Sequence, residues 1–219
     1  MIDISIKNNL DQITSSLPEH VRLVCVSKFR SDEEVEEVYE YGIKDIAENR
    51  VQNLIDRRDK FSDKFKYHMI GRLQTNKVKY LVGWVELIHS LDRESLLYEL
   101  EKQGEKNNFI FNCLIQLNVS KEESKTGIYI EDLDNFIEKV KQLKYVNIRG
   151  FMTMAPFTDD RAYLKKLFNN CKKIFDKYKN IRYNNFNIEH LSMGMSNDYM
   201  LAIEEGANMV RIGSKIFEN

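Results

Sequence analysis

A lysine that follows a short apolar run near the start of the chain is the first candidate for covalent chemistry. Residues 23–26 read Leu-Val-Cys-Val, and Ser27 and Lys28 come next. Such a run predicts a strand buried on both faces, as in a parallel sheet, and ligands bind at the carboxyl ends of these strands. Shielding by the strand would favour a neutral amine, which attacks carbonyl groups. The alternative is a solvated lysine that opens a loop.

Two stretches late in the chain are candidate phosphate sites. In residues 191–198, Leu-Ser-Met-Gly-Met-Ser-Asn-Asp, Ser192 and Ser196 supply hydroxyls and Gly194 permits a close backbone approach. A helix predicted to begin after them adds unpaired N–H groups and a favourable dipole. In residues 210–214, Gly213 can present backbone amides in the same way. The alternative is a pair of ordinary loops with a capping serine.

An arginine inside an apolar run is the third candidate. Arg211 lies within Met-Val-Arg-Ile, residues 209–212. Because burying a lone charge is costly, this guanidinium needs a partner. That partner is either a carboxylate, in a structural ion pair, or a ligand.

Taken together, these residues predict a ligand that carries both a carbonyl and a phosphate. Two classes fit: pyridoxal phosphate bound to Lys28, or a phosphosugar in a class I aldolase. Arg211 favours the first class, because a cation or a carboxylate tunes the pyridine nitrogen of that cofactor. An aldolase would need an acid–base partner beside Lys28, and no carboxylate stands out in that role.

The elements that must position these residues alternate between strands and helices. After a first helix over about residues 2–16, apolar runs predict strands at residues 23–26, 44–49, 67–71, 85–90, 111–119, 146–153, 186–192 and 208–213. Helical patterns follow at about 31–41, 51–60, 76–81, 93–105, 130–143, 159–177 and 197–205. Ser31 with Glu34 forms a predicted capping box, and Gly42 a predicted helix end.

Eight such strands predict an α/β fold, a single (β/α)8 TIM-type barrel with an extra N-terminal helix. The alternative is an open doubly wound sheet, but no dinucleotide glycine fingerprint follows the first strand. We expect one domain over residues 1–219, with residues 1–17 forming a helix that plugs the barrel or packs on its side.

Composition is that of a cytoplasmic protein that binds neither nucleic acid nor membranes. The chain has 219 residues, 42% of them hydrophobic and 31% charged, with a net charge of −1. No secretory signal or membrane-length apolar run is evident. The three cysteines are far apart, which predicts reduced core thiols, and the four histidines lack metal-ligand spacing.

From about residue 21 to residue 217 the sequence resembles the pyridoxal phosphate homeostasis proteins, built on the alanine racemase type of barrel. Seven motifs carry the resemblance: VSK (26–28), AEN (47–49), HMIGRLQTNK (68–77), SKTG (124–127), GFMTMAP (150–156), LSMGMSND (191–198) and VRIG (210–213). The chain departs from the family at Phe29 and Arg30, where small or basic residues and a proline are more usual.

The resemblance implies roles for individual residues. Lys28 resembles the lysine that forms the internal aldimine with pyridoxal phosphate. Ser192 and Ser196, with backbone amides around Gly194 and Gly213, resemble the phosphate cradle. Arg211 resembles the arginine that faces the pyridine nitrogen. Three further positions resemble the pocket wall: Asn49, His68 and Met154.

The resemblance further implies a non-catalytic protein of pyridoxal phosphate homeostasis. A racemase needs an acid–base group on each face of the cofactor, and in alanine racemases a second domain supplies one of them. An arginine at the ring nitrogen also gives up no proton, which makes the ring a weaker electron sink. We expect a monomer that contacts pyridoxal phosphate-dependent apoenzymes transiently. The alternative is a pyridoxal phosphate-dependent amino-acid racemase or lyase.

Overall fold

Eight parallel strands close into a barrel in the computed structural model, which describes residues 4–119 and 126–218. They are β1 (Arg22–Val26), β2 (Asp45–Glu48), β3 (Lys66–Met69), β4 (Leu87–Leu91), β5 (Phe111–Asn118), β7 (Val146–Met152), β9 (Phe186–Ser192) and β10 (Met209–Ile212). Each strand pairs with the next, and β10 pairs with both β9 and β1. This closed ring confirms the predicted barrel.

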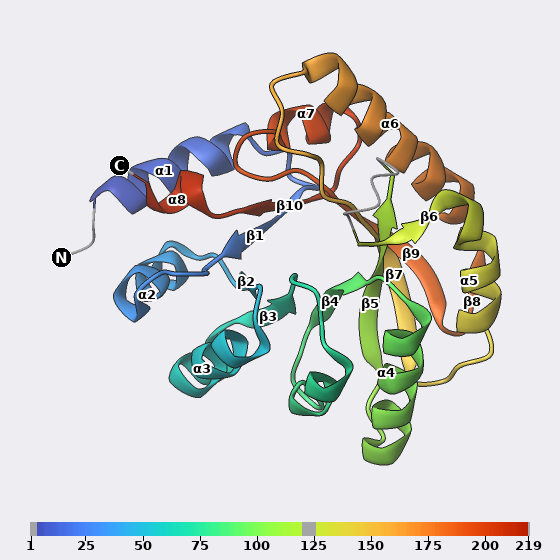
Figure 1. Ribbon diagram of the computed structural model, residues 1–219. Coiled ribbons are helices and arrows are strands. Elements are labelled where there is room, and N and C mark those ends of the chain that lie inside the picture. Colours follow the sequence, from blue (N-terminus) through green and yellow to red (C-terminus); the bar gives the residue numbers. More distant parts are fainter. Residues whose placement is uncertain (1–3, 120–125, 219) are drawn as a thin grey trace.

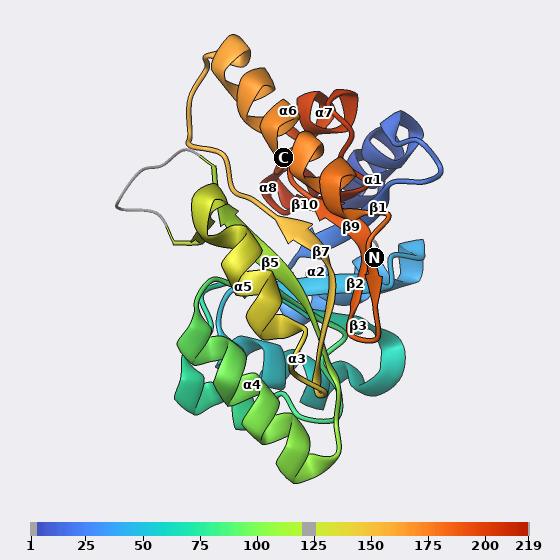
Figure 2. The same cartoon turned by 90° about the vertical axis from the view of Figure 1, so that its right-hand side faces the viewer.

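The helices lie outside the strands (Figures 1 and 2). They are α2 (Asp32–Tyr41), α3 (Val51–Phe61), α4 (Glu94–Asn107), α5 (Leu133–Val140), α6 (Arg161–Tyr178) and α7 (Tyr199–Glu204). The predicted helix at 76–81 is a 3-10 helix, η2 (Thr75–Tyr80), and short 3-10 segments precede β3 (η1, Ser62–Lys64) and α5 (η3, Ile130–Asp132). Unpredicted short elements are β6 (Ile128–Tyr129), β8 (Arg182–Tyr183) and α8 (Ser214–Phe217).

The helix that follows β1 begins and ends as the sequence predicts. The Ser31 side chain accepts a hydrogen bond from the Glu34 backbone, and the Glu34 carboxylate accepts one from the Ser31 N–H at 2.7 Å. Gly42 ends α2 in the left-handed region, with φ at +110°. Since glycine has no Cβ, this conformation carries little strain. The cap fixes where the β1–α2 loop rejoins regular structure.

The N-terminal helix α1 (Ile4–Ser16) packs on the side of the barrel, beside α8 (Figure 1). Its buried face carries Ile6, Leu10 and Ile13. The Asn9 amide donates to the backbone oxygens of Ile216 and Glu218 at 3.1 and 2.9 Å. Of the two placements considered from the sequence, packing on the side is therefore the observed one.

The barrel interior is partly apolar and partly polar. Small and medium apolar side chains fill one part of it: Val24, Val26, Ala47, Leu87, Leu114, Met152 and Met209. Between them lie four buried polar side chains, those of His68, His89, Ser192 and Arg211. The larger apolar core lies between the strands and the surrounding helices. The polar group inside the barrel leads directly to the candidate site.

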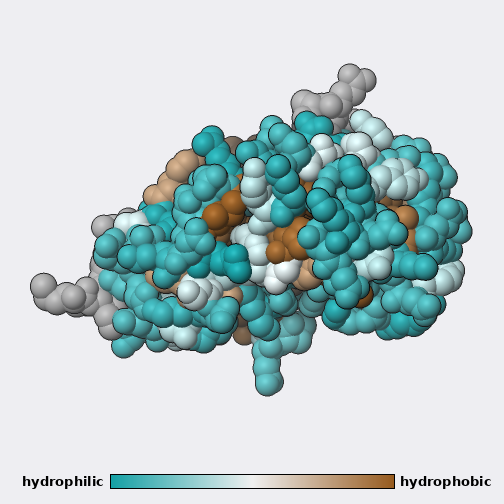
Figure 3. Space-filling view, turned by 90° about the horizontal axis from the view of Figure 1, so that it is seen from below, coloured by the Kyte–Doolittle hydropathy of each residue, from teal (hydrophilic) through white to brown (hydrophobic). Residues whose placement is uncertain are grey.

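The surface of the described residues is mostly hydrophilic, in line with the 31% of charged residues in the sequence. Figure 3 shows one face, where hydrophilic residues dominate and hydrophobic ones form small patches near the middle. Every helix in the described ranges is too short or too polar to span a bilayer.

The thiols of Cys25, Cys113 and Cys171 are free and buried, as predicted. Within the same ranges no metal-ligand cluster occurs. Part of the SKTG motif, Ser124 and Lys125, lies outside the described residues.

Candidate functional site

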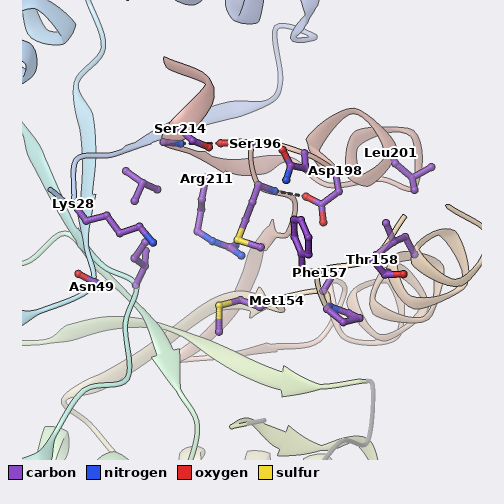
Figure 4. Close-up of a pocket in the computed structure, with 18 of the residues that line it drawn as sticks. Lys28, Asn49, Met154, Phe157, Thr158, Ser196, Asp198, Leu201, Arg211 and Ser214 are labelled. Atoms are coloured by element: carbon purple, nitrogen blue, oxygen red, sulfur yellow. Dashed lines mark hydrogen bonds between the residues drawn. The ribbon is translucent and has the colours of Figure 1, made fainter. Parts of the chain in front are cut away.

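A cavity of about 920 Å³ opens at the carboxyl ends of the strands (Figure 4). In (β/α)8 barrels this face carries the ligand site. Six of the nine predicted site residues line the cavity: Lys28, Asn49, Met154, Ser196, Arg211 and Gly213. Lys28 extends from one wall towards Arg211, and Asn49 lies on the same side as the lysine (Figure 4). Residues far apart in the sequence thus converge on one cavity.

Lys28 lies in the loop that follows β1, and neighbouring groups hold that loop in place. The Arg57 guanidinium donates to the backbone oxygens of Ser27, at 3.3 Å, and of Arg30. Phe29 adopts φ +66°, an unusual conformation for a residue with a side chain. The expectation that β1 would shield Lys28 from water is wrong, because the residue is exposed at the cavity wall. Its amine is therefore open to a ligand.

Arg211 lies at the floor of the cavity and is only 3% exposed. It donates to the Ser192 hydroxyl at 2.6 Å and to the Thr153 backbone oxygen at 2.9 Å. Both partners are uncharged, so the structural ion pair considered from the sequence is not what holds it. Burial lowers the pKa of Arg211 to about 10, which leaves the guanidinium charged at neutral pH. The cavity floor therefore presents a cation.

Hydroxyl and amide groups from the ends of β9 and β10 meet at another edge of the cavity. The Ser196 hydroxyl accepts from the backbone N–H groups of Gly213, at 3.4 Å, and Lys215, at 3.3 Å. Ser214 also lines the cavity and lies beside Ser196 (Figure 4). Backbone amides and hydroxyls at such a loop suit a phosphate. Ser214 ends the stretch 210–214 that the sequence indicated as a candidate phosphate site, where Gly213 alone was predicted as a contact.

Three predicted contact residues do not line the cavity. Ser192 is fully buried, and its hydroxyl bonds to Arg211 inside the barrel. His68, also fully buried, lies deeper in the barrel interior. Gly194 is packed against α7, where an added Cβ would lie 2.7 Å from the Ala202 Cβ. The structure therefore places these three residues behind the cavity wall, where Ser192 contacts Arg211, and their contact with a cofactor stays a prediction.

The side-chain amide of Asn49, in the cavity wall, has an oxygen that accepts no hydrogen bond from the described residues. Its side-chain oxygen is buried without a hydrogen-bond partner among the described residues. Buried polar atoms of this kind are rare, because leaving one unpaired costs free energy. The neighbouring Gly71 holds the wall in place, since an added Cβ would lie 2.1 Å from the Asn49 backbone oxygen. The amide therefore stands ready to contact a ligand.

Sequence reasoning also missed the segment that leads from β7 to α6. The backbone and side chains of residues 155–159 line the cavity, and Phe157 is 94% exposed at its mouth. Asp198 lines the opposite part, where its carboxylate accepts a hydrogen bond from the Met195 N–H at 2.6 Å. The only sequence signal for the first segment was its place after a barrel strand, in the GFMTMAP motif.

Two fully buried histidines, His68 and His89, and the partly buried His190 predict a loss of stability in mild acid. Burial lowers the pKa of His190 to about 4 and also lowers the pKa values of His68 and His89. The unfolded chain therefore binds protons first, and stability falls as pH drops from about 6.5 towards 4. We expect His190 alone to contribute a loss of about 2–3 kcal/mol in the free energy of unfolding.

Denaturant unfolding of the cofactor-free protein at pH 7.5, 5.5 and 4.5 measures this loss. The His190→Gln variant serves as the control, and its stability should depend less on pH than that of the parent chain. A free energy of unfolding that stays constant between pH 7.5 and 4.5 would contradict the assignment of neutral buried histidines.

Comparison with known proteins identifies the class of barrel. The alanine racemase N-terminal domain family matches residues 4–218. Alanine racemase of Clostridium difficile 630 superposes with a TM-score of 0.79 at 17% identity, over 98% of this chain and 56% of the racemase. The fold is therefore that of the alanine racemase N-terminal domain, which confirms both the predicted barrel and the resemblance to this type of barrel.

Closer relatives define the family within this class. The pyridoxal phosphate homeostasis protein of Aquifex aeolicus is 42% identical over 197 residues, 90% of this chain and 86% of that protein. The Helicobacter pylori J99 protein of the same name is 37% identical over 201 residues, 90% of this chain and 87% of that protein. The chain belongs to the pyridoxal phosphate homeostasis protein family. PipY of Synechococcus elongatus, solved with pyridoxal phosphate bound, superposes with a TM-score of 0.87 at 30% identity, over 97% of this chain and 99% of PipY.

Proposed function

We propose that this protein binds pyridoxal 5'-phosphate on Lys28 without catalysing a reaction and serves pyridoxal phosphate homeostasis. The observation that carries the proposal is the convergence of three groups in one cavity: an amine, a buried cation and an amide–hydroxyl cradle. Each matches one part of the cofactor, namely its aldehyde, its pyridine nitrogen and its phosphate. The pyridoxal phosphate bound to PipY supports the choice of this cofactor.

The residues present fit the cofactor. Lys28 would supply the amine that holds the aldehyde of the cofactor covalently. Ser196, Gly213 and Ser214 would hold its phosphate with hydroxyls and backbone amides. Arg211, at the cavity floor, would face its ring nitrogen. Independently of these groups, the unpaired amide oxygen of Asn49 can accept a hydrogen bond from a polar ligand in the cavity.

The lining residues favour a carrier over an enzyme. Arg211 stays protonated at neutral pH, so a ring nitrogen beside it gains no proton from it. Among the described residues that line the cavity there is no tyrosine, histidine or cysteine, and the Asp198 carboxylate there accepts a hydrogen bond from the Met195 N–H at 2.6 Å. A cofactor held in this way is stored on the lysine and released to enzymes that use it.

Incubation of the loaded protein with a panel of D- and L-amino acids tests this function. We expect the protein to take up one equivalent of added pyridoxal phosphate and to racemise or cleave no amino acid above the rate of the free cofactor. Failure to take up the cofactor would overturn the proposal of binding. Turnover that Lys28→Ala abolishes would overturn the proposal that the protein is non-catalytic and favour a racemase or lyase.

A further inference from the structure

A chain of hydrogen bonds crosses the barrel interior beneath the cavity floor. Arg211 contacts the Ser192 hydroxyl at 2.6 Å, and that hydroxyl lies 3.2 Å from Nδ1 of His89. Nε2 of His89 lies 3.0 Å from Nδ1 of His68. Nε2 of His68 lies 2.9 Å from the Asp45 carboxylate. The chain thus connects a cation at the cavity to a partly exposed carboxylate at the start of β2.

The carboxylate end fixes the direction of every bond in this chain. Burial acts to raise the pKa of Asp45, but hydrogen bonds from His68 and Arg22 hold it at about 2, so Asp45 is an acceptor. His68 must then carry its proton on Nε2, which leaves Nδ1 to accept from His89. His89 carries its proton on Nε2 as well, and its Nδ1 accepts from the Ser192 hydroxyl. Ser192 in turn accepts from Arg211.

With this direction each group in the chain is satisfied while both histidines stay neutral. The reverse direction would need a doubly protonated His68, because Asp45 has no proton to give. Both imidazoles are 0% exposed, so a charge there would be poorly solvated. Protonation of His89 is also opposed by nearby positive charges, those of Arg22 and Arg211. The neighbouring His190 ring would oppose it as well if it were protonated. Glu86 is the further carboxylate that acts on His68.

We propose that His89 is a positioning residue for Arg211, which it orients through the Ser192 hydroxyl so that the guanidinium faces the ligand in the cavity. Asp45 and His68 hold the His89 ring in the tautomer that accepts from Ser192. Without that acceptor the hydroxyl can turn, and the hydrogen bond that fixes one edge of the guanidinium weakens. This inference deepens the proposed function and rests on it for the identity of the ligand.

The first test uses the protein without cofactor. Long-range ¹⁵N–¹H NMR at pH 7.5 reports the tautomer of each of the four histidines, and His68→Gln and His190→Gln variants assign the signals. We expect His68 and His89 both to be neutral with the proton on Nε2. We also expect hindered, separately resolved Arg211 Nη signals. A proton on Nδ1 of His89, or an imidazolium at either position, would overturn the chain as drawn.

Two substitutions then separate positioning from simple packing. His89→Asn keeps an acceptor where Nδ1 lies, whereas His89→Leu removes it. We expect His89→Leu to average the Arg211 Nη signals, to shift the visible band of bound pyridoxal phosphate and to raise its dissociation constant about tenfold. His89→Asn should restore all three readouts to near the parent values, and His190→Leu is the control for lost packing inside the barrel.

These readouts distinguish the failure of this inference from the failure of the proposed function. If the parent protein binds no pyridoxal phosphate, the proposed function is wrong. The histidine tautomers and the Arg211 signals then still test the hydrogen-bond chain, because they are measured without cofactor. Equal Arg211 signals in His89→Leu and the parent would overturn the positioning role. A band shift of the same size in His190→Leu would overturn it as well, because packing alone would then explain the effect.

Discussion

Replacement of Lys28 by alanine is expected to abolish the visible absorbance of the loaded protein and to raise the dissociation constant of pyridoxal phosphate about a hundredfold. Lys28 is the only lysine among the described residues that line the cavity. Its loss removes the covalent link and leaves only the phosphate and ring-nitrogen contacts. Absorbance spectra and equilibrium dialysis at several cofactor concentrations measure both effects.

Two further variants make this result specific. Lys28→Arg keeps a positive charge but has no free amine, so it should lose the visible band as alanine does. Lys102→Ala removes a lysine on the exposed face of α4, 72% exposed in its side chain, and should bind as the parent does. A Lys28→Ala protein that keeps both the band and the affinity would contradict the assignment of the cofactor to this residue.

Gly71→Ala is expected to have the largest effect on stability among the cavity residues. The added methyl would lie 2.1 Å from the Asn49 backbone oxygen and 2.8 Å from its carbonyl carbon. Since backbone atoms cannot turn away as a flexible side chain can, the ends of β2 and β3 must separate. We expect a loss of about 3 kcal/mol or more in the free energy of unfolding, together with weaker cofactor binding.

Gly83→Ala is the matched control for this substitution. Gly83 has φ +86°, but an added Cβ there would meet no atom within 4 Å. Only conformational strain opposes alanine at that position, which costs about 1–2 kcal/mol. Denaturant unfolding of both variants measures the difference. If Gly71→Ala is no less stable than Gly83→Ala, Gly71 does not lie as close to the Asn49 backbone as the structure places it.

The barrel and the main cavity residues could be predicted from the sequence, because each is indicated by a pattern within a short stretch of the chain. Eight apolar runs alternate with helical patterns, and Ser31, Glu34 and Gly42 have the cap geometry predicted for them. Lys28 stands at the end of such a run, and Arg211 interrupts one. Both positions are unusual for a charged residue, and both residues line the cavity.

The predicted site residues that do not line the cavity are placed by the alignment of the strands with one another. His68 pairs in register with Ala47, which pairs with Val26, two residues before Lys28. This alignment puts His68 inside the barrel below the lysine, and the alternation along a single strand cannot reveal it. Ser192 likewise turns inward to Arg211, a contact between β9 and β10. The buried chain through His89 draws one residue from each of five strands, so it arises only when these strands are assembled.

Borohydride reduction of the loaded protein, followed by peptide mass mapping, tests the central claim most directly. We expect one reduced pyridoxyl group per chain, on the peptide that contains Lys28, with loss of the visible band. Pyridoxyl on another lysine, with Lys28 unmodified, would contradict the account. So would a protein that gains no pyridoxyl group and instead traps a phosphosugar at Lys28, as an aldolase would.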